Sequence, residues 1–457
     1  MRNNNHIVIM AGGVGSRFWP MSTPEYPKQF VDVLGRGMSM IQMTVERFAP
    51  LCPIENMWVV TSADYEALVR EQLPQLPVEN ILLEPAMRNT APCIAYACWK
   101  IRQKNPSANV VVTPADALVV DVDDFRKVIG RALEFTAAGH RIVTVGIRPT
   151  RPETGYGYIE IAGQAGNDGG GSGNDGVCND GGGSGNDGVC NDGGGSGNDG
   201  ADNEGAGSVN DSVGNDGVGN DGAANDGAAN DGVDNDGVCN DGVANDGVDN
   251  DGVVNDGVAH DGADNDGADV TPDLIGSPLK VDSFREKPAL EVARQYLAAG
   301  NYLWNAGIFV WNIDTIVESL RAFVPRLAAK MDIMSESFFT PSEREVVGDI
   351  FPTCEKISID YAVMEKADYI YTIPGDFGWS DVGTWGSLWT LLSHDEDGNA
   401  VVGENVHLND CRGCIVHAPG AESVVLQGLE DSIVVERDGR LLVCKLSEEQ
   451  RIKDFVK

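Results

Sequence analysis

Near its start the chain has a short apolar run that ends in a glycine-rich turn, and this junction constrains the fold more than any other segment. Residues 7–10 are all apolar, as in a buried strand. The turn then brings three glycines and, soon after, two cations: Gly12, Gly13, Gly15, Arg17 and Lys28. Glycine N–H groups can surround phosphate oxygens because no Cβ is in the way, and the cations add positive charge. The segment predicts a loop that binds a nucleoside triphosphate.

Two common phosphate-binding loops do not fit this segment. A P-loop ends its glycine run with Gly-Lys-Ser/Thr, whereas Gly15 is followed by Ser16 and Arg17. The dinucleotide motif G-x-G-x-x-G, counted from Gly13, needs a third glycine where this chain has Phe18. Both a P-loop ATPase and a hydride-transfer enzyme are therefore disfavoured. For the glycines alone, a plain tight turn is the structural alternative.

Apolar runs alternate with amphipathic stretches through much of the chain. The expected strands are residues 7–10, 57–61, 81–84, 110–113 and 141–146, and the expected helices are 39–48, 63–73, 90–104 and 123–138. This alternation predicts an α/β fold, a mostly parallel, Rossmann-like sheet with helices on both faces. Ligands in such sheets bind beyond the carboxyl ends of the strands. The glycine turn and residues 84–90 and 114–116 all follow strand ends, so we expect them at one edge.

Residues 163–270 are tandem Asn-Asp-Gly repeats, with a period of 12 residues and then of five. They contain no Lys, Arg or aromatic residue, and too few large apolar residues to offset the entropy of ordering. We predict a disordered insertion. Residues 155–161 and 281–285 on either side have the pattern of strands, so the insertion is expected to leave from the tip of a hairpin.

Calcium binding is the alternative interpretation of these repeats. The string GGSGND begins at Gly170, Gly182 and Gly194 and matches the start of a calcium-binding β-roll repeat. A β-roll repeats every nine residues and needs a large apolar residue in each turn, whereas this chain offers Val, Ala or Cys at other periods. We therefore favour disorder, with weak cation binding left open.

Composition is informative once the insertion is set apart. The insertion holds 24 of the 70 acidic residues, which leaves 46 against 33 basic ones, a net charge of −13. This balance argues against non-specific binding of nucleic acid. No membrane-spanning apolar run and no secretory signal are visible, and the ten scattered cysteines indicate reduced thiols in a cytoplasmic protein. We interpret Cys411 and Cys414 as flanking a turn rather than as half of a metal site.

From residue 401 onwards the pattern changes to short strands separated by turns. The expected strands are 414–417, 423–426, 432–436 and 441–445, with a hairpin turn at Asp438 and Gly439 and a helical tail over 447–456. We predict a catalytic domain formed by residues 1–162 and 271–400, and a small β-rich C-terminal domain over 401–457. Packing or assembly is the expected role of the small domain.

Two aspartates are candidate metal ligands. Asp116 directly follows an expected buried strand, and Asp381 lies among small residues far along the chain. One or two carboxylates together with phosphate oxygens suit Mg²⁺, although either aspartate alone has the pattern of a turn or helix cap. Between strand and helix, Thr90 is expected to cap the helix 90–104, and Arg88 and Asn89 either contact a nucleotide or only join the two elements.

Taken together, the motifs resemble those of sugar nucleotidyltransferases, in the form found in guanylyltransferases that act on mannose 1-phosphate. The matching strings are AGGVGSRFWP and PKQF within 11–30, EPAMRNTAP at 84–92, FREKP at 284–288, LWNAGIF at 303–309 and SIDYAVMEK at 358–366. The resemblance implies a Mg²⁺-dependent transfer of GMP from GTP to mannose 1-phosphate, giving GDP-mannose and pyrophosphate. Some members carry a further isomerase domain, for which the residues after Val402 are too few, so we expect the transferase activity alone.

The resemblance also assigns roles to individual residues. The catalytic residues would be Arg17, Lys28 and Lys287, and the nucleotide-binding residues Gly12, Gly13, Gly15, Glu84, Arg88 and Asn89. The sugar would meet Gly157, Glu286 and Asn305, and the metal Asp116 and Asp381. The family often has a histidine after the first metal aspartate, where this chain has Ala117. Residues 358–366 are expected to form a helix packed on the sheet, with a site contact from Lys366.

Three other interpretations stay open at this point. They are the same chemistry with another hexose 1-phosphate or nucleotide, a non-catalytic regulatory relative, and a calcium-binding repeat protein. A homodimer is also compatible with the sequence.

Deleting residues 163–270 is expected to leave nucleotidyl transfer largely intact, because closing a long surface loop costs free energy only with the logarithm of its length. Turnover of the deleted and full-length proteins, measured side by side, checks this. Loss of folding would show that the repeats are structural. A calcium titration followed by circular dichroism tests the competing view, which requires the repeats to become ordered.

Overall fold

The computed structural model describes residues 4–13, 15–162 and 275–455, and all of these belong to one compact unit. The predicted insertion over 163–270, its disorder and its calcium binding lie outside the described residues. Within the described part, no helix is both long and apolar enough to cross a membrane.

A nine-stranded sheet forms the centre of the fold, with strand order β3-β2-β1-β4-β9-β6-β10-β8-β7. Its strands are β1 (Asn5–Ala11), β2 (Met57–Ser62), β3 (Ile81–Glu84), β4 (Asn109–Pro114), β6 (Ile142–Ile147), β7 (Tyr158–Ile161), β8 (Leu279–Arg285), β9 (Tyr302–Asn312) and β10 (Ile370–Gly375). Strands β3, β2, β1 and β4 are parallel, whereas β9 lies antiparallel between β4 and β6. The expected α/β fold is confirmed, with a sheet that is parallel in one half and mixed in the other.

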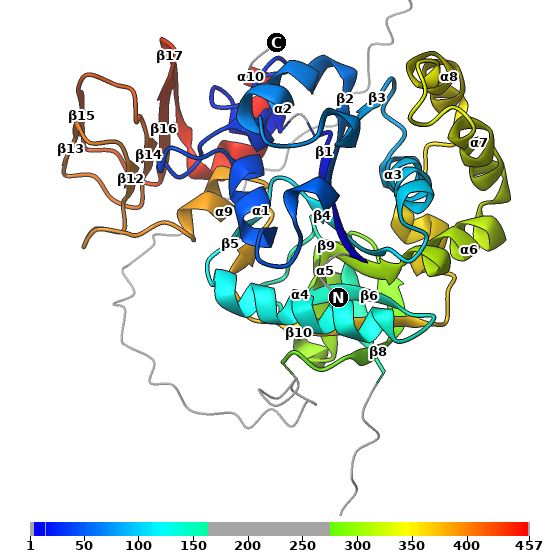
Figure 1. Ribbon diagram of the computed structural model, residues 1–457. Helices are drawn as coiled ribbons and strands as arrows, with labels where there is room; N and C mark the ends of the chain where they lie inside the picture. Colours follow the sequence, from blue (N-terminus) through cyan, green and yellow to red (C-terminus); the bar gives the residue numbers. More distant parts are fainter. Residues whose placement is uncertain (1–3, 14, 163–274, 456–457) are drawn as a thin grey trace, which may run out of the picture. The chain divides into compact units, whose positions relative to one another are not determined.

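Helices cover both faces of this sheet because side chains alternate along each strand. They are α1 (Met40–Phe48), α2 (Glu66–Gln72), α3 (Thr90–Lys104), α4 (Val122–Ala137), α5 (Leu290–Ala299), α6 (Ile313–Phe323), α7 (Pro325–Ser335) and α8 (Glu343–Ile350). In β1, Ile7 and Ile9 pack in one apolar core with α1 and α4, and Val8 packs in the other with α3 and α6. Figure 1 shows α4 across the front of the central strands and α3, α6, α7 and α8 gathered on the right.

The strands on either side of the insertion pair as the sequence predicts. β7 and β8 are antiparallel, with Tyr158 opposite Arg285 and Ile159 opposite Phe284. β7 also pairs with β9, which places Tyr158 opposite Trp304. The residues just before β7 are thereby held against β9.

A two-stranded ribbon stands apart from the large sheet and joins distant segments. β5 (Leu118–Val119) pairs antiparallel with β11 (Trp379–Ser380), with Ser380 opposite Leu118. Gly378 enters this ribbon at a φ of +63°, and a Cβ there would lie 2.8 Å from the Val120 side chain, so the close approach requires glycine. Nothing in the local pattern of residues 378–381 had indicated a strand.

The C-terminal strands form a small coil of parallel strands. β12 (Ala400–Val402), β14 (Ile415–His417) and β16 (Ser432–Arg437) stack in one sheet, and β13 (Val406–Asn409) and β15 (Val424–Gln427) stack in a second. The chain passes from one sheet to the other at each turn, around a core that contains the thiols of Cys411 and Cys414. The predicted strands are confirmed, but their parallel stacking was not anticipated.

The coil ends in the hairpin that the sequence predicts. β16 pairs antiparallel with β17 (Arg440–Lys445). Asp438 and Gly439 in the turn have φ values of +53° and +75°, as a two-residue turn with two positive φ angles requires. A short 3₁₀ segment (Leu446–Arg451) and α10 (Ile452–Phe455) form the helical tail.

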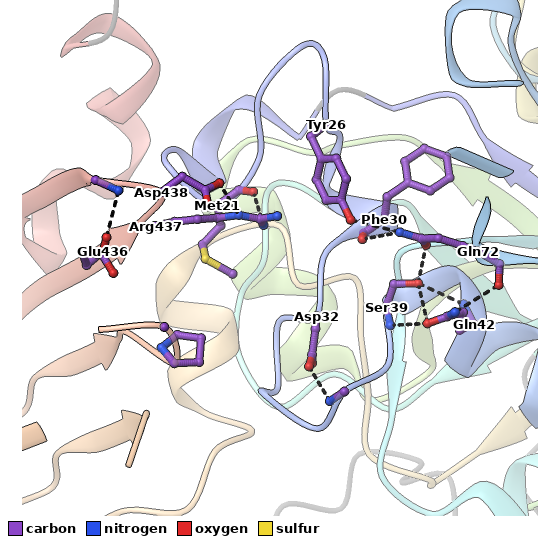
Figure 2. A pocket seen from close by; sticks show the side chains of 14 residues that line it. Met21, Tyr26, Phe30, Asp32, Ser39, Gln42, Gln72, Glu436, Arg437 and Asp438 are labelled. Carbon is purple, nitrogen blue, oxygen red and sulfur yellow. Dashed lines mark hydrogen bonds and ion pairs between the residues drawn. The ribbon is translucent and has the colours of Figure 1, made fainter. Parts of the chain in front are cut away.

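One apolar cluster spans the domain boundary expected at residue 400. It combines side chains that follow the glycine turn with side chains of the C-terminal coil and of α9 (Trp385–Trp389): Phe18, Met21, Val31, Trp385, Ile415, Ile433 and Val435 are among its members. Arg437 Nη1 also donates to the Met21 carbonyl at 2.8 Å, and its guanidinium lies 4.8 Å from the Tyr26 ring centroid. Figure 2 shows Met21, Tyr26 and Arg437 among the side chains that line a pocket. The pocket has a volume of about 640 Å³, and none of the predicted site residues lines it. The division into two domains stays a prediction.

Candidate active site

The glycine turn leaves the end of β1 and folds back against Lys28. Gly15 has a φ of +66°, and a Cβ there would lie 2.7 Å from the Cβ of Lys28, so only glycine fits. The carbonyl of Ala11, at the end of β1, accepts hydrogen bonds from Gln29 Nε2 at 3.0 Å and Thr61 Oγ1 at 2.7 Å. These bonds fix the point from which the loop starts.

Lys28 is the residue on which the site converges. Its side chain is only 4 % exposed, and Nζ donates to Asp116 Oδ2 at 3.2 Å, to the Asp381 carbonyl at 2.6 Å and to the Val382 carbonyl at 2.8 Å. An ammonium group has three donors, so all of them are engaged. Lys28 therefore joins the glycine-loop segment to both segments that carry the predicted metal carboxylates.

The β5–β11 ribbon explains why these carboxylates lie together. Because Ser380 pairs with Leu118 in an antiparallel register, Asp381 comes opposite the residues just before Leu118, beside Asp116. Val382 follows with a φ of +46°, unusual for a β-branched residue, and this turns its carbonyl towards Lys28.

Asp381 is held by further hydrogen bonds. Its Oδ1 accepts from the Tyr156 hydroxyl at 2.8 Å and from the Gly383 N–H at 2.9 Å. Burial raises the pKa of the Asp381 carboxyl, and the nearby Asp116 charge adds to this, while Lys28 opposes it. Tyr156 was not among the predicted site residues. Its only signal in the sequence was its place beside Gly157 in a string with the family's pattern.

The two aspartates fit the requirements of Mg²⁺. Asp116 remains 42 % exposed, so its carboxylate is open to a ligand, and Asp381 is held beside it. Among the described residues no cluster of three or more His, Cys, Asp or Glu side chains could hold a metal ion. Mg²⁺ is usually bound by one or two carboxylates, with waters and substrate phosphates as its other ligands, and this pair suits that arrangement.

Glu84 lies at the end of β3, next to the glycine turn. A Cβ on Gly12 would lie 3.7 Å from Glu84 Oε2, and Oε1 is a buried oxygen without a hydrogen-bond partner in the described structure. Burial raises the pKa of this carboxyl to about 8. A carboxyl with one buried, unpartnered oxygen beside the glycine turn is a candidate for contact with a nucleotide.

The next two predicted nucleotide residues have structural contacts of their own. The Arg88 guanidinium donates to the Pro352 carbonyl, which holds it on the turn after α8. Asn89, with a φ of +69°, is the cap of α3, and its side chain accepts from the Thr90 N–H at 2.8 Å. The expectation that Thr90 caps this helix was therefore wrong. Thr90 is the first helical residue, and its Oγ1 accepts from the Ile359 N–H at 2.9 Å.

The three predicted sugar-binding residues lie in mutual contact. A Cβ on Gly157 would lie 2.9 Å from Glu286 Oε2 and 3.6 Å from the Asn305 Cβ, so glycine permits this approach. The Asn305 N–H donates to the Gly157 carbonyl at 2.8 Å. Asn305 Nδ2 donates to Asp360 at 3.2 Å, a residue that sequence reasoning had placed in a packing helix.

The remaining predicted residues are more exposed. Lys287 has a φ of +40°, and its Nζ lies 2.7 Å from Glu286 Oε1, with 62 % of the side chain exposed. Arg17 and Lys366 are exposed as well. Residues 360–364 form a π-helical turn (Asp360–Met364) within the segment that was expected to be a helix. Arg17 on the glycine turn and Lys287 beside Glu286 are thus both accessible from solvent.

Glu84→Gln is expected to raise stability at pH 8 more than at pH 5. The carboxyl has an ordinary pKa of 4.5 and a pKa of about 8 in the folded protein, so the folded state keeps a proton that the unfolded chain releases. The wild-type free energy of unfolding therefore falls as the pH rises between these values, and glutamine has no such proton to lose. Urea unfolding at both pH values measures this, with the exposed Glu71→Gln as control. An equal effect at both pH values would contradict the raised pKa.

Comparison with known proteins agrees with this site. A protein-family model described as "Nucleotidyl transferase" matches residues 6–168 and 269–398 of this chain. A mannose-1-phosphate guanylyltransferase of Salmonella montevideo is 31 % identical over 98 % of this chain and 72 % of its own length, and a putative one of Vibrio cholerae is 28 % identical over 98 % and 73 %. A solved structure described as a mannose-1-phosphate geranyltransferase from Thermus thermophilus shares the fold, with a TM-score of 0.68 at 24 % identity over 99 % of this chain and 98 % of that one. Glycine loop, carboxylate pair and sugar-side motif thus occur together in a chain that belongs to the nucleotidyl transferase family.

Proposed function

We propose that this protein transfers GMP from GTP to α-D-mannose 1-phosphate, forming GDP-mannose and releasing pyrophosphate. The observation that carries the proposal is an unbroken series of contacts from the glycine loop through Lys28 and Asp381 to Tyr156, continued from Gly157 to Asn305. A phosphate loop, a carboxylate pair and a group of sugar-binding type thus lie along one path. Relatives in Salmonella montevideo and Vibrio cholerae carry the name of this activity.

The reaction depends on positioning of the two phosphates and on stabilisation of their charge, and it needs no general base. An oxygen of the hexose 1-phosphate attacks the α-phosphorus of GTP, and the bond to the pyrophosphate oxygen breaks. This nucleophile is already ionised at neutral pH, since the second pKa of a phosphate ester is about 6. We expect Lys287 to orient the attacking phosphate, and Arg17 with the glycine N–H groups to stabilise the departing pyrophosphate.

Lys28 would act on the reacting phosphates through its charge rather than through a free hydrogen-bond donor. Its donors are engaged by Asp116 and the 381–382 backbone, so its charge offsets the two carboxylates and contributes a positive field at the α-phosphate. Asp116 and Asp381 would hold Mg²⁺, which would supply charge stabilisation for the phosphate oxygens when bound. Metal dependence is a proposal that rests on these two side chains.

Glu84 is the best-placed residue to select guanine. The edge of guanine carries an N2 amino donor that adenine lacks. A carboxylate accepts hydrogen bonds, and donors from the base favour its ionised form and lower a pKa that burial has raised. The unpartnered Oε1 beside Gly12 is available for such a bond.

The proposed partners are GTP and mannose 1-phosphate. A cytoplasmic location and a homodimer stay predictions from the sequence. The nearest alternative is the same transfer with another base or hexose.

A substrate panel tests the proposal. Pyrophosphate release is measured for each nucleoside triphosphate with each of several hexose 1-phosphates, with Mg²⁺ and after its removal by a chelator. We expect the highest kcat/KM with GTP and mannose 1-phosphate, and activity that is lost on chelation and restored by Mg²⁺. Preference for UTP or glucose 1-phosphate would overturn the substrate assignment, and no turnover at saturating Mg²⁺ would support a non-catalytic relative.

Lys28→Ala is expected to lower kcat by at least about 100-fold, as typically follows loss of a charged contact that stabilises the transition state. The variant also removes the link between the Asp116 carboxylate and the 381–382 backbone. Lys127→Ala, whose side chain is 69 % exposed on α4, serves as control and should turn over normally. A near-normal rate for Lys28→Ala would refute the role given to this residue.

A further inference from the structure

The segment that contains Asp360 connects the nucleotide side of the site to the sugar side. The Ala91 N–H donates to the Ile357 carbonyl at 3.1 Å, and the Ile359 N–H donates to Thr90 Oγ1 at 2.9 Å, which ties the segment to the start of α3. The π-helical turn then begins at Asp360. Its carboxylate is thus anchored beside the end of the nucleotide loop and directed towards β9.

Asn305 donates a hydrogen bond to this carboxylate, and the other hydrogen bonds of Asn305 fix the direction of its amide. Its Oδ1 accepts from Thr144 Oγ1 at 2.9 Å and from the Gly307 N–H at 3.1 Å. Two donors on one oxygen fix the orientation of the amide, so Nδ2 must point the other way, where it donates to Asp360 Oδ1 at 3.2 Å. Asn305 is therefore held by protein on both sides of its amide, and one of its two Nδ2 hydrogens is directed at Asp360.

Asp360 and Glu286 form a pair of acidic side chains at this place. Burial raises the pKa of Asp360 to about 6, and the charge of Glu286 adds to the shift. Glu286 in turn lies against Gly157, where an added Cβ would be 2.9 Å from Glu286 Oε2, and it forms an ion pair with Lys287. Carboxylates accept hydrogen bonds, so a set of neutral hydroxyl donors would satisfy the pair without adding charge. The pair lies at Gly157, in the group of residues that the resemblance assigns to the sugar.

We propose that Asp360 is a sugar-binding residue that accepts a hydrogen bond from a hydroxyl of the hexose, and that Asn305 is the positioning residue that aims it. Asn305 engages Oδ1, and a carboxylate has further acceptor sites for a ligand. The inference rests on the proposed function in that the ligand is taken to be a hexose 1-phosphate. It differs from the sequence expectation, in which Asn305 met the sugar and residues 358–366 packed on the sheet with a site contact from Lys366.

The test is a substitution combined with altered sugars. Asp360→Asn keeps size but removes the charge and an acceptor oxygen. Wild type and variant are assayed with mannose 1-phosphate and with its 2-, 3-, 4- and 6-deoxy analogues. Glu355→Gln, an exposed carboxylate earlier in the same segment, is the matched control. GTP saturation curves are measured for every protein.

We expect Asp360→Asn to raise KM for mannose 1-phosphate at least about tenfold, with KM for GTP changed less than about twofold. The decisive result is the loss of discrimination between mannose 1-phosphate and one of its deoxy analogues. The wild type should use that analogue poorly, whereas the variant should use it with the same kcat/KM as mannose 1-phosphate, because the variant no longer binds the missing hydroxyl. A purely structural role for Asp360 would lower activity with every analogue in proportion.

Three outcomes would overturn the inference. They are unchanged discrimination against all four analogues, an equal rise of KM for GTP and for the sugar phosphate, and an effect of Glu355→Gln as large as that of Asp360→Asn. If Asp360→Asn fails to fold, Asp360→Glu keeps the charge and displaces it by one methylene, and must show the same selective change.

Failure of the proposed function has a different signature. A wild-type enzyme that ignores mannose 1-phosphate but uses another hexose 1-phosphate would refute the proposed substrate, and Asp360 would then be tested with deoxy analogues of the sugar that is used. A wild-type protein that uses no sugar phosphate would overturn both.

Discussion

The buried ammonium group of Lys28 is the interaction on which the site depends. Taking an ammonium out of water is unfavourable unless acceptors replace the solvent, and here three oxygens do so: one from Asp116 and two from the backbone at Asp381 and Val382. Removing the ammonium would leave all three acceptors without this partner, so these segments are coupled to Lys28. The positive φ of Val382 fits this view, since that backbone turn brings its carbonyl to the ammonium. The glycine loop and the carboxylate pair therefore form one physical unit.

The C-terminal coil supports the same unit from outside. Phe18, one residue after Arg17, lies 4.8 Å from the Trp385 ring, and Lys28 Nζ lies 5.4 Å from the Phe18 ring centroid. Trp385 belongs to the apolar cluster that also contains Ile415 and Ile433 of the coil. The coil was expected to serve packing or assembly. Its packing partners include Phe18, directly after the glycine turn, so a change in the coil would be felt at that turn.

The sequence predicted those features that local patterns encode. The expected strands and helices of the first half, the hairpin turn at Asp438 and Gly439 and the α/β class are confirmed, because each depends on residues close together in the chain. The partners of Lys28 lie 88 and more than 350 residues away, and the β5–β11 ribbon pairs two strands of two residues each. No local periodicity encodes such contacts. The parallel coil escaped prediction for a related reason, since strands of three or four residues do not reveal their pairing partners. Asp360 was assigned to packing because its string has a helical pattern.

The Asp116–Asp381 carboxylate pair and the group around Asn305 are joined through two consecutive residues, Tyr156 and Gly157. The Tyr156 hydroxyl donates to the Asp381 carboxylate, and the next residue, Gly157, accepts from the Asn305 N–H. The Asn305 side chain in turn donates to Asp360. Tyr156 is itself fixed between the rings of Trp304 and Trp379, at 5.2 and 5.3 Å. Trp304 precedes Asn305 on β9, and Trp379 lies in the ribbon that brings Asp381 to Asp116. A shift of Asn305 would therefore move the hydrogen bond on Asp381. In the proposed reaction this linkage would position the attacking phosphate and the metal together, as an in-line transfer that depends on geometry requires.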